Sequence, residues 1–404
     1  MTVPGAPGAL ARLRRLLEHE RLPLVAALFA VVLALPALAS GRVVDDHVQA
    51  RIFAEGVGIM GTPTRPLDMF SFFPDDAAGR AELLRYGMWP WWASEDLHLE
   101  FWRPLTALTH WADHALYPEA VALHHLHSIL WYALVAWLAA RRLRRLLEPR
   151  WVAGLAALWY AAADVHALPA GWLANRSALC ATAAGLCALW AHDRWRREGW
   201  RPGGALGPLA FAAALGAGEY GLGIAGYLLA HALWLDPAPR RRSLLALAPY
   251  ALVALGWALL DRALGYGATG SGLYLDPAHD PLAFASAVLT RAPVLVASQL
   301  FVPLADLFPF LPRDRTWVLT VGGALGVGLC LAVLRPAEAS PTRRLLAAGA
   351  LLSLVPVCAT FPNDRLSFFS SLGVTALVAD LAARAAALPR ARRALAWLLV
   401  LRQA

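Results

Sequence analysis

Long apolar runs, separated by short breaks that contain arginine, make up most of this chain. Apolar residues dominate 22–39, 124–140, 151–163, 177–191, 244–264, 317–334, 345–360 and 366–388, and Gly216-Ala217-Gly218-Glu219 divides a longer run at 203–235. Runs of about 20 apolar residues are typical of helices that cross a bilayer. The pattern therefore predicts an all-α, polytopic transmembrane helix bundle with about ten spans, or eleven if 282–304 also crosses.

The composition agrees with a protein that lies mostly inside a membrane. Hydrophobic residues make up 59% of the 404 residues, charged residues make up 16%, and the mean hydropathy is +0.50. A soluble domain is about one quarter charged, so an ordinary soluble enzyme, a disordered chain and a secreted disulfide scaffold are excluded. All four cysteines lie in apolar segments without a CxxC pair, and residues 1–404 are expected to form a single transmembrane domain.

Arginine clusters indicate how the spans are oriented. All 36 basic residues are Arg, and clusters at 141–145, 194–197 and 240–242 follow alternate apolar runs. The positive-inside rule then places the N-terminus in the cytoplasm of a multi-pass protein, which we expect in a bacterial inner membrane. We interpret 22–39 as a first span rather than a signal peptide, because many spans follow it. The same distribution argues against nucleic-acid binding, despite the net charge of +8.

The segment 282–304 is the uncertain one. If it crossed fully, Arg335, Arg343 and Arg344 would lie outside, against the charge rule. We therefore favour a segment that dips into the membrane or lies along its outer face.

Residues 40–104 form the one long polar stretch, and we expect them to be an extracytoplasmic loop. The stretch begins with Asp45-Asp46-His47, a few residues beyond the first span. A loop this long is usually functional. Two adjacent carboxylates can hold a divalent metal, or one can act as a general base while the other orients a partner. The alternative is a solvated pair that merely begins a loop helix.

Four further charged groups fall at predicted outer ends of helices, where ionisable residues are costly and usually functional. Arg103 precedes a proline in Phe101-Trp102-Arg103-Pro104-Leu105, and Arg176 opens a helix after Asn175. Arginine in such places suits a phosphate or carboxylate. Glu219 is a lone carboxylate that needs a partner, and Arg365 lies between the last two full spans. An interface anchor, a helix cap or an outer turn is the structural alternative for these groups.

Histidines offer a weaker signal. His110 and His114 are four residues apart on a predicted helix, a spacing that zinc sites use, but no HExxH is present. Ordinary interfacial histidines, including His124, are the favoured interpretation.

In order along the chain, these motifs resemble the membrane half of a GT-C glycosyltransferase. The corresponding segments are Asp45-Asp46, Trp102-Arg103-Pro104-Leu105, Leu123-His124, Asp164-Val165-His166 with Asn175-Arg176, Gly218-Glu219, and Arg365 with Phe368-Phe369-Ser370-Ser371. More narrowly, the chain resembles the protein O-mannosyltransferase-like group, in particular the membrane region of tetratricopeptide-containing O-mannosyltransferases. It differs from that group at Gly218, where a Lys is usual, at Asn175, where a Gly is usual, and in lacking the repeats.

The resemblance implies an inverting transfer of a sugar from a polyprenyl-phosphate donor to a hydroxyl of a protein, lipid or glycan, on the extracytoplasmic face. It implies catalytic roles for Asp45 and Asp46, donor-phosphate binding by Arg103, Arg176 and Arg365, and supporting roles for His124, His166 and Glu219. Asp45 is the preferred general base. No resident metal is expected, although a divalent metal at Asp45/Asp46 stays open.

Two rival functions remain. A catalytically inactive scaffold of the same fold would act in envelope assembly. A transporter would place its polar residues along midmembrane helices, whereas the midspan positions here are mostly Ala, Leu and Val.

Overall fold

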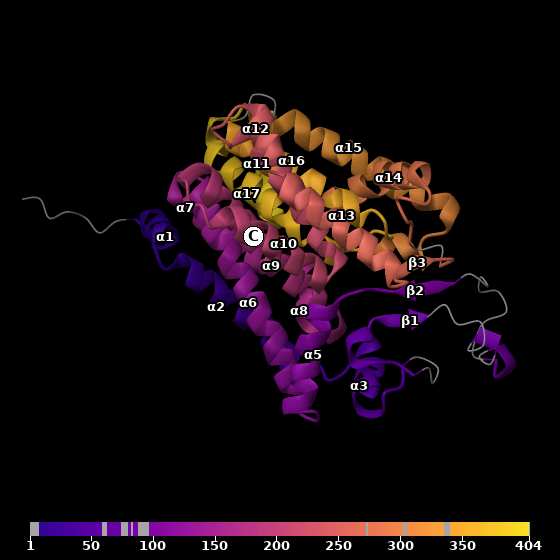
Figure 1. The fold of residues 1–404 in the computed structure, drawn as a ribbon. Coiled ribbons are helices and arrows are strands. Elements are labelled where there is room, and N and C mark those ends of the chain that lie inside the picture. Colours follow the sequence, from indigo (N-terminus) through magenta and orange to yellow (C-terminus); the bar gives the residue numbers. More distant parts are fainter. Residues whose placement is uncertain are drawn as a thin grey trace, which may run out of the picture.

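The computed structural model describes residues 8–58, 63–73, 80–81, 84–87, 97–271, 274–301, 305–334 and 340–403. These residues are mostly helical, and Figure 1 shows the helices gathered into one bundle. Its first half contains α1 (Ala9–Glu18), α2 (Leu22–Ala34), α3 (Asp45–Glu55), α5 (Pro104–Leu116), α6 (Val121–Leu146), α7 (Arg150–Ala162), α8 (Ala167–Gly171) and α9 (Arg176–Glu198). Its second half contains α10 (Gly203–Ala217), α11 (Ile224–Trp234), α12 (Arg240–Leu245), α13 (Ala248–Ala263), α14 (Pro281–Leu300), α15 (Thr316–Leu334), α16 (Pro341–Val357), α17 (Phe368–Arg384) and α18 (Arg390–Gln403).

Short 3₁₀ helices and three short strands join these helices. The 3₁₀ helices used below are η4 (Asp164–His166), η5 (Leu173–Asn175), η6 (Glu219–Gly223) and η10 (Asp364–Leu366). The strands are β1 (Ser71–Phe73), β2 (His98–Glu100) and β3 (Gly267–Thr269).

Small buried residues hold the bundle together. Ala26, Ala136, Ala140 and Ala153 are fully buried on α2, α6 and α7, which pack against one another. Small side chains let helix backbones approach closely, which is how helices associate in lipid. Large apolar side chains occur both in this core, as Phe211 and Phe368 show, and on the outer surface of the bundle, as Leu252 shows at 69% exposure. Exposed apolar side chains of this kind suit a surface that faces lipid.

Fewer helices can cross a membrane than the sequence pattern predicts. Among the described residues, five are long and apolar enough: Leu22–Ala39, Val121–Leu146, Arg240–Ala263, Pro281–Leu300 and Phe368–Ala387. A sixth exists if Arg150–Ala162 and Asp164–Gly171, bent by 47° at their junction, count as one span. The prediction of ten to eleven spans is therefore wrong.

Breaks within the apolar runs explain the difference. The run at 203–235 divides at Gly218 into α10 of 15 residues and α11 of 11 residues, both shorter than a span needs. Helix α9 is long enough but is buried along most of its length and carries charges near its end. Hydropathy alone does not separate a helix buried in protein from one that faces lipid.

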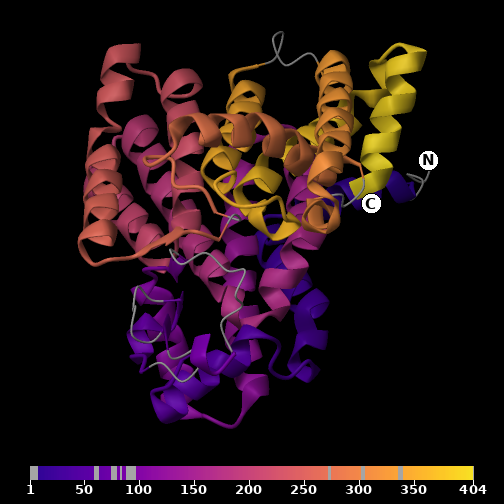
Figure 2. The same cartoon turned by 90° about the vertical axis from the view of Figure 1, so that its right-hand side faces the viewer.

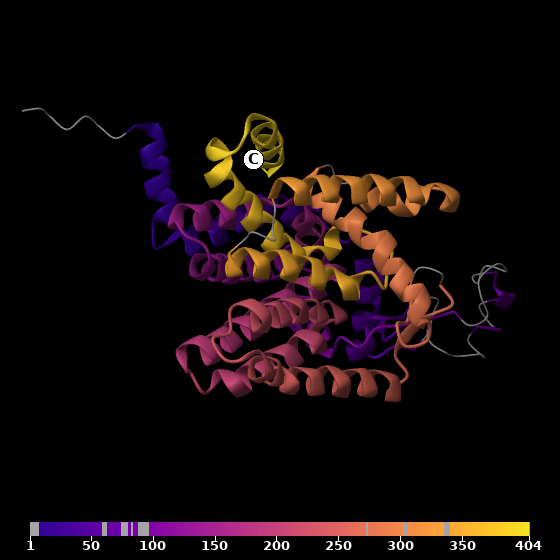
Figure 3. The same ribbon diagram turned by 90° about the horizontal axis from the view of Figure 1, so that it is seen from above.

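Helix α14 lies across the bundle, although it is long and apolar enough to span a membrane. Its middle contacts the end of α16, where Arg291 Nη1 donates to the Cys358 carbonyl at 2.9 Å. Its last turn contacts the start of α17, where Gln299 Nε2 donates to Ser370 Oγ at 3.2 Å. Both contacts lie at the same end of α16 and α17, and Figures 2 and 3 show α14 running obliquely between α13 and α15.

The described part of the 40–104 loop packs on one end of the bundle. Strand β2 pairs antiparallel with β1 and with β3, so the loop joins the segment that follows α13. A small apolar core of Ile52, Met69, Phe70 and Ala107 fastens α3 to α5. The sheet therefore brings both loops to one end of the bundle.

The opposite end carries the arginine clusters. Asp193 on α9 forms ion pairs with three arginines. Arg142 and Arg145, both on α6, lie at 2.9 and 3.0 Å, and Arg197, on α9 itself, lies at 3.3 Å. Arg145 and Arg197 belong to the last turns of α6 and α9, where cations interact favourably with the helix dipole.

Candidate functional site

A cavity of about 810 Å³ opens beside the three-stranded sheet. Its walls come from β2 and β3, η6, α13, the segment 274–278 and the end of α16. Polar and aromatic groups line it: His98, Glu100, Glu219, Tyr220, Trp257, Asp261, Arg262, Tyr266, Tyr274 and Asp276. Most of these residues come from outer loops and helix ends, so the cavity has the mixed lining that small-molecule sites use.

Arg103 and Glu219 form an ion pair at the edge of this cavity. Arg103 Nε donates to Glu219 Oε2 at 2.9 Å, and Nη2 donates to Oε1. Phe70 and Phe101 hold the guanidinium, with ring centroids 5.0 and 4.5 Å from its carbon. Burial is the largest single influence on the pKa of Glu219 and would raise it, but the charge and hydrogen bonds of Arg103, together with a backbone hydrogen bond and the Arg365 charge, lower the pKa overall. Glu219 is therefore an ionised carboxylate with a partner, as a lone charge in an apolar run requires.

The position of Glu219 depends on a tight return of the chain after α10. A Cβ at Gly221 would lie 2.6 Å from the backbone carbon of Ala214, so this close approach requires glycine. The return turns η6 toward the cavity and brings Glu219 to Arg103, which lies 116 positions earlier in the chain.

Asp45 and Asp46 begin α3 but have different environments. Asp46 is buried, and its Oδ2 and Oδ1 accept hydrogen bonds from the Val43 N–H at 2.9 Å and the Ala174 N–H at 2.8 Å. These bonds fasten the start of α3 to η5. Asp45 is half-buried, and no described residue donates a hydrogen bond to its carboxylate.

The pKa of Asp45 is raised above its ordinary value. Burial is the main cause and the negative charge of Asp46 adds to it, while the positive charge of Arg365 opposes both. A carboxylate with a raised pKa and a free oxygen is suited to accept a proton.

Arg365 lies within electrostatic reach of both carboxylate sites. Its charge lowers the pKa of Asp45 and of Glu219, although these residues belong to α3 and η6. The guanidinium lies over the Trp172 ring, 5.1 Å from the centroid. Its buried Nε has no hydrogen-bond partner, and no carboxylate in the described ranges forms an ion pair with it. Arg365 is thus a cation available to an anionic ligand.

Arg176 lies elsewhere and is fully buried. Its Nη1 contacts Asp113 Oδ2 at 2.5 Å, Nε donates to Ser128 Oγ at 2.9 Å, and Nη2 donates to the His124 carbonyl at 2.8 Å. The expected anion site at this helix start is therefore occupied by the protein's own Asp113, which the sequence analysis did not single out.

The two supporting histidines also lie outside the cavity. His166 stacks on Phe368 with centroids 4.3 Å apart, and its Nε2 lies 3.1 Å from Ser371 Oγ. His124 Nε2 lies 3.1 Å from the Tyr117 carbonyl. Both are buried and have partners in the packed interior. Of the eight expected site residues, only Glu219 is among the described residues that line the cavity. Arg103 pairs with Glu219, and Asp45, Asp46 and Arg365 lie on other elements, with Arg365 in electrostatic reach of Asp45 and Glu219. Arg176, His124 and His166 pack inside the bundle.

Several cavity residues carry no motif that sequence reasoning could detect. Tyr266 donates from its hydroxyl to Asp68 Oδ1 at 2.6 Å and so links the segment after α13 to the 40–104 loop. Tyr274 packs against Phe101 with centroids 5.5 Å apart.

The geometry offers little for a metal at Asp45 and Asp46. One group of three or more metal-ligating side chains is found among the described residues, namely His192, His231 and Asp236, and it lies at the arginine-rich end.

Comparison with protein-family models, with curated proteins and with solved structures finds no match for this chain.

Proposed function

We propose that this protein is an integral-membrane glycosyltransferase that moves a sugar from a polyprenyl-phosphate donor to a hydroxyl acceptor on the extracytoplasmic face. The observation that carries the proposal is the placement of Asp45 and Arg365. A half-buried carboxylate without a hydrogen-bond donor lies within electrostatic reach of an arginine without an ion-pair partner, in the described structure. This is the charge arrangement that a base and a phosphate leaving group need.

In the proposed reaction, Asp45 accepts the proton of the acceptor hydroxyl. The acceptor oxygen forms a bond to the anomeric carbon as the bond from that carbon to the phosphate oxygen breaks, with inversion. The phosphate leaves with the bonding electron pair, and Arg365 stabilises its negative charge. Arginine is suited to this role because its planar fork matches phosphate oxygens and keeps its charge.

Asp46, Arg103 and Glu219 have supporting roles in this scheme. Asp46 is fixed by two backbone N–H groups and holds α3 in place. Arg103 and Glu219 pair with each other and form one edge of the cavity. The resemblance assigned donor phosphate to Arg103 and Arg176 as well, but both guanidinium groups already contact carboxylates, so the proposal keeps only Arg365 for the phosphate.

The cavity is suited to hold a sugar. Trp257, Tyr266 and Tyr274 offer aromatic faces, while Asp261 and Asp276 offer carboxylates to hydroxyl groups. Apolar bodies with a few polar groups are the usual composition of a small-molecule site.

The proposal is tested with Asp45→Asn in membranes supplied with radiolabelled polyprenyl-phosphate sugars. The amide keeps the size but does not accept the proton, so transfer should fall about 10²- to 10⁴-fold. Glu55→Gln is the matched control, because Glu55 lies on the same helix and pairs only with exposed Arg51. Retention of most of the rate in Asp45→Asn would remove Asp45 as the base. If the wild-type protein transfers none of the sugars tried, the result favours the inactive scaffold.

A further inference from the structure

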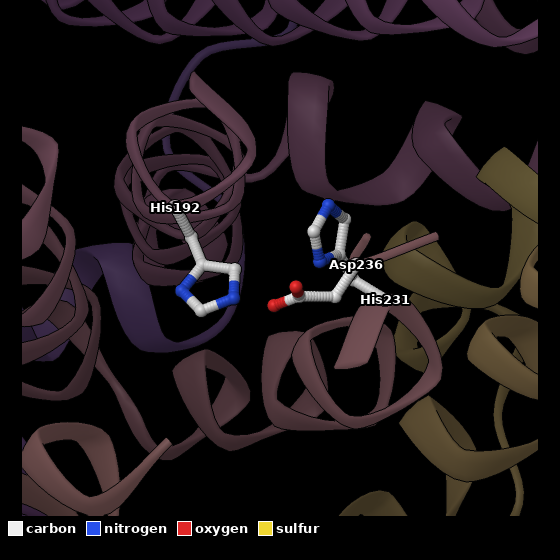
Figure 4. Close-up of side chains that lie close together, drawn as sticks. All are labelled: His192, His231 and Asp236. Atoms are coloured by element: carbon white, nitrogen blue, oxygen red, sulfur yellow. The ribbon is translucent and has the colours of Figure 1, made fainter. Parts of the chain in front are cut away.

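Three metal-ligating side chains converge at the arginine-rich end of the bundle. His192 lies near the end of α9, His231 near the end of α11, and Asp236 shortly after α11. One ligand atom from each lies within 4.8 Å of the others, and Figure 4 shows the two rings and the carboxylate turned toward one another. His192 is 16 residues from the start of α9, so this cluster is about 24 Å from the Arg176 end of that helix.

Three of the four histidine nitrogens in this cluster are buried and have no hydrogen-bond partner in the described structure. Neither ring nitrogen of His192 has a hydrogen-bond partner, and the same is true of His231 Nδ1. Both side chains are fully buried. An unpaired buried polar group typically costs about 1–3 kcal/mol, so three such atoms beside one carboxylate require an explanation.

The remaining nitrogen of His231 is held in the manner of a metal ligand. His231 Nε2 lies 3.0 Å from Asp193 Oδ1, and Asp193 is itself fixed by Arg142 at 2.9 Å. A proton on Nε2 that donates to this carboxylate leaves Nδ1 with a lone pair. Carboxylate–histidine–metal chains of this kind set the tautomer and the ring orientation at zinc sites.

Asp236 can still bind a metal, although its carboxylate also accepts hydrogen bonds from an arginine. Arg196 Nε donates to Asp236 Oδ2 at 2.6 Å and Nη2 donates to Oδ1 at 3.3 Å, while the Ala238 N–H donates to Oδ1 at 2.9 Å. Each carboxylate oxygen accepts more than one bond, so Oδ2 keeps a free position. The nearby arginines oppose any dication, which disfavours ions that bind only by charge.

We infer that His192, His231 and Asp236 form a Zn²⁺ site that ties α9 to α11 at the arginine-rich end. Two imidazole nitrogens and one carboxylate oxygen match the ligand preference of zinc, with distances near 2.0–2.2 Å once the side chains close on the ion. Magnesium and calcium prefer all-oxygen sets and are excluded by the two histidines. This inference does not depend on the proposed sugar transfer, which takes place at the other end.

The competition between Arg196 and the metal for Asp236 makes the inference sharply testable. Arg196→Gln removes a positive charge that repels the dication and frees the carboxylate, so it should bind zinc at least about tenfold more tightly. His192→Gln removes a ligand and should weaken binding by at least as much. His279→Gln, at an exposed histidine in another segment, is the matched control.

The experiment uses the full chain, purified in detergent without a polyhistidine tag, stripped with chelator and titrated with Zn²⁺. Bound metal is counted by mass spectrometry, and Co²⁺ absorption reports the coordination. We expect one zinc per chain in the wild type and in His279→Gln, tighter binding in Arg196→Gln and a large loss in His192→Gln. If His192→Gln does not fold, the wild-type Co²⁺ spectrum and the zinc affinity of Arg196→Gln still test whether the site binds a metal. Wild-type protein that binds no stoichiometric metal, or Arg196→Gln that binds no more tightly, overturns the inference.

Discussion

The buried pair of Arg176 and Asp113 gives a prediction that separates a structural role from a role in the site. Both side chains are fully buried, and Asp113 has two other partners, His127 Nδ1 at 2.7 Å and the Tyr117 hydroxyl, which donates to it at 3.3 Å. Removing one member of a buried ion pair leaves an uncompensated charge and typically costs about 3–5 kcal/mol. Arg176→Gln should therefore lower the free energy of unfolding by about 4 kcal/mol, close to a thousandfold in the folding equilibrium.

The partner variant and the double variant refine this expectation. Asp113→Asn leaves the cation buried, but Ser128 Oγ and the His124 carbonyl still accept its bonds, so its cost should be nearer about 3 kcal/mol. The double variant leaves no unpaired charge, and its cost should be smaller than the sum of the two by about 1–3 kcal/mol.

Unfolding by sodium dodecyl sulfate in mild detergent, followed by fluorescence of the 17 tryptophans, measures these differences. Arg51→Gln is the control, because its ion pair with Glu55 is exposed and should be worth at most about 1 kcal/mol. If Arg176→Gln is as stable as the wild type, the reasoning about the buried pair is refuted. If it is also unable to transfer sugar, Arg176 belongs to the donor site, as the family resemblance implied.

Four further predictions address the site and the topology. Arg365→Lys should raise the donor concentration needed for half-maximal transfer, and Arg365→Ala should raise it further, whereas equal donor dependence in all three proteins would remove Arg365 from the phosphate site. Transfer should fall as the pH is lowered through the pKa of Asp45, since only the carboxylate accepts a proton, and this limb should lie above the range of an ordinary Asp because burial raises that pKa. Arg365→Gln removes a charge that lowers the pKa of Asp45, so in the pH–rate profile the limb should move to higher pH; a shift to lower pH would contradict this reasoning. In a cysteine-free background, His279→Cys should react with an impermeant thiol reagent in intact cells and Arg241→Cys only after permeabilisation; the reverse result would invert the orientation.

The sequence allowed the helical class, the polar loop and the gathering of charges at one end to be predicted, because each depends on local pattern. The break at Gly218-Glu219 could be predicted because small residues interrupt the apolar run there, and in the structure the 3₁₀ helix η6 begins at Glu219. The number of spans was not predictable, because hydropathy does not separate an apolar helix buried in protein, such as α9, from one that faces lipid.

A candidate site residue could be predicted only where its position in the chain alone suggested a role. Asp45 lies at a helix start and Arg365 in a turn between two apolar runs, so both could be singled out from the sequence. The pairing of Arg176 with Asp113 joins residues 63 positions apart, and the His192–His231 cluster depends on how α9 packs on α11. Such contacts arise from tertiary packing, which no periodicity of the sequence records.

The sheet beside the cavity also has a consequence for the order of folding. Strand β2 pairs with β3 in the register His98 to Thr269, and the chain between them contains every helix from α5 to α13. The entropy of closing such a loop grows with the logarithm of its length, so the pairing is favourable only when the intervening helices have already packed. During synthesis β2 is made long before its partner strand β3. The cavity is therefore completed late, and a chain stalled before α13 lacks the cavity walls that α13 and β3 supply, however well its first helices have folded.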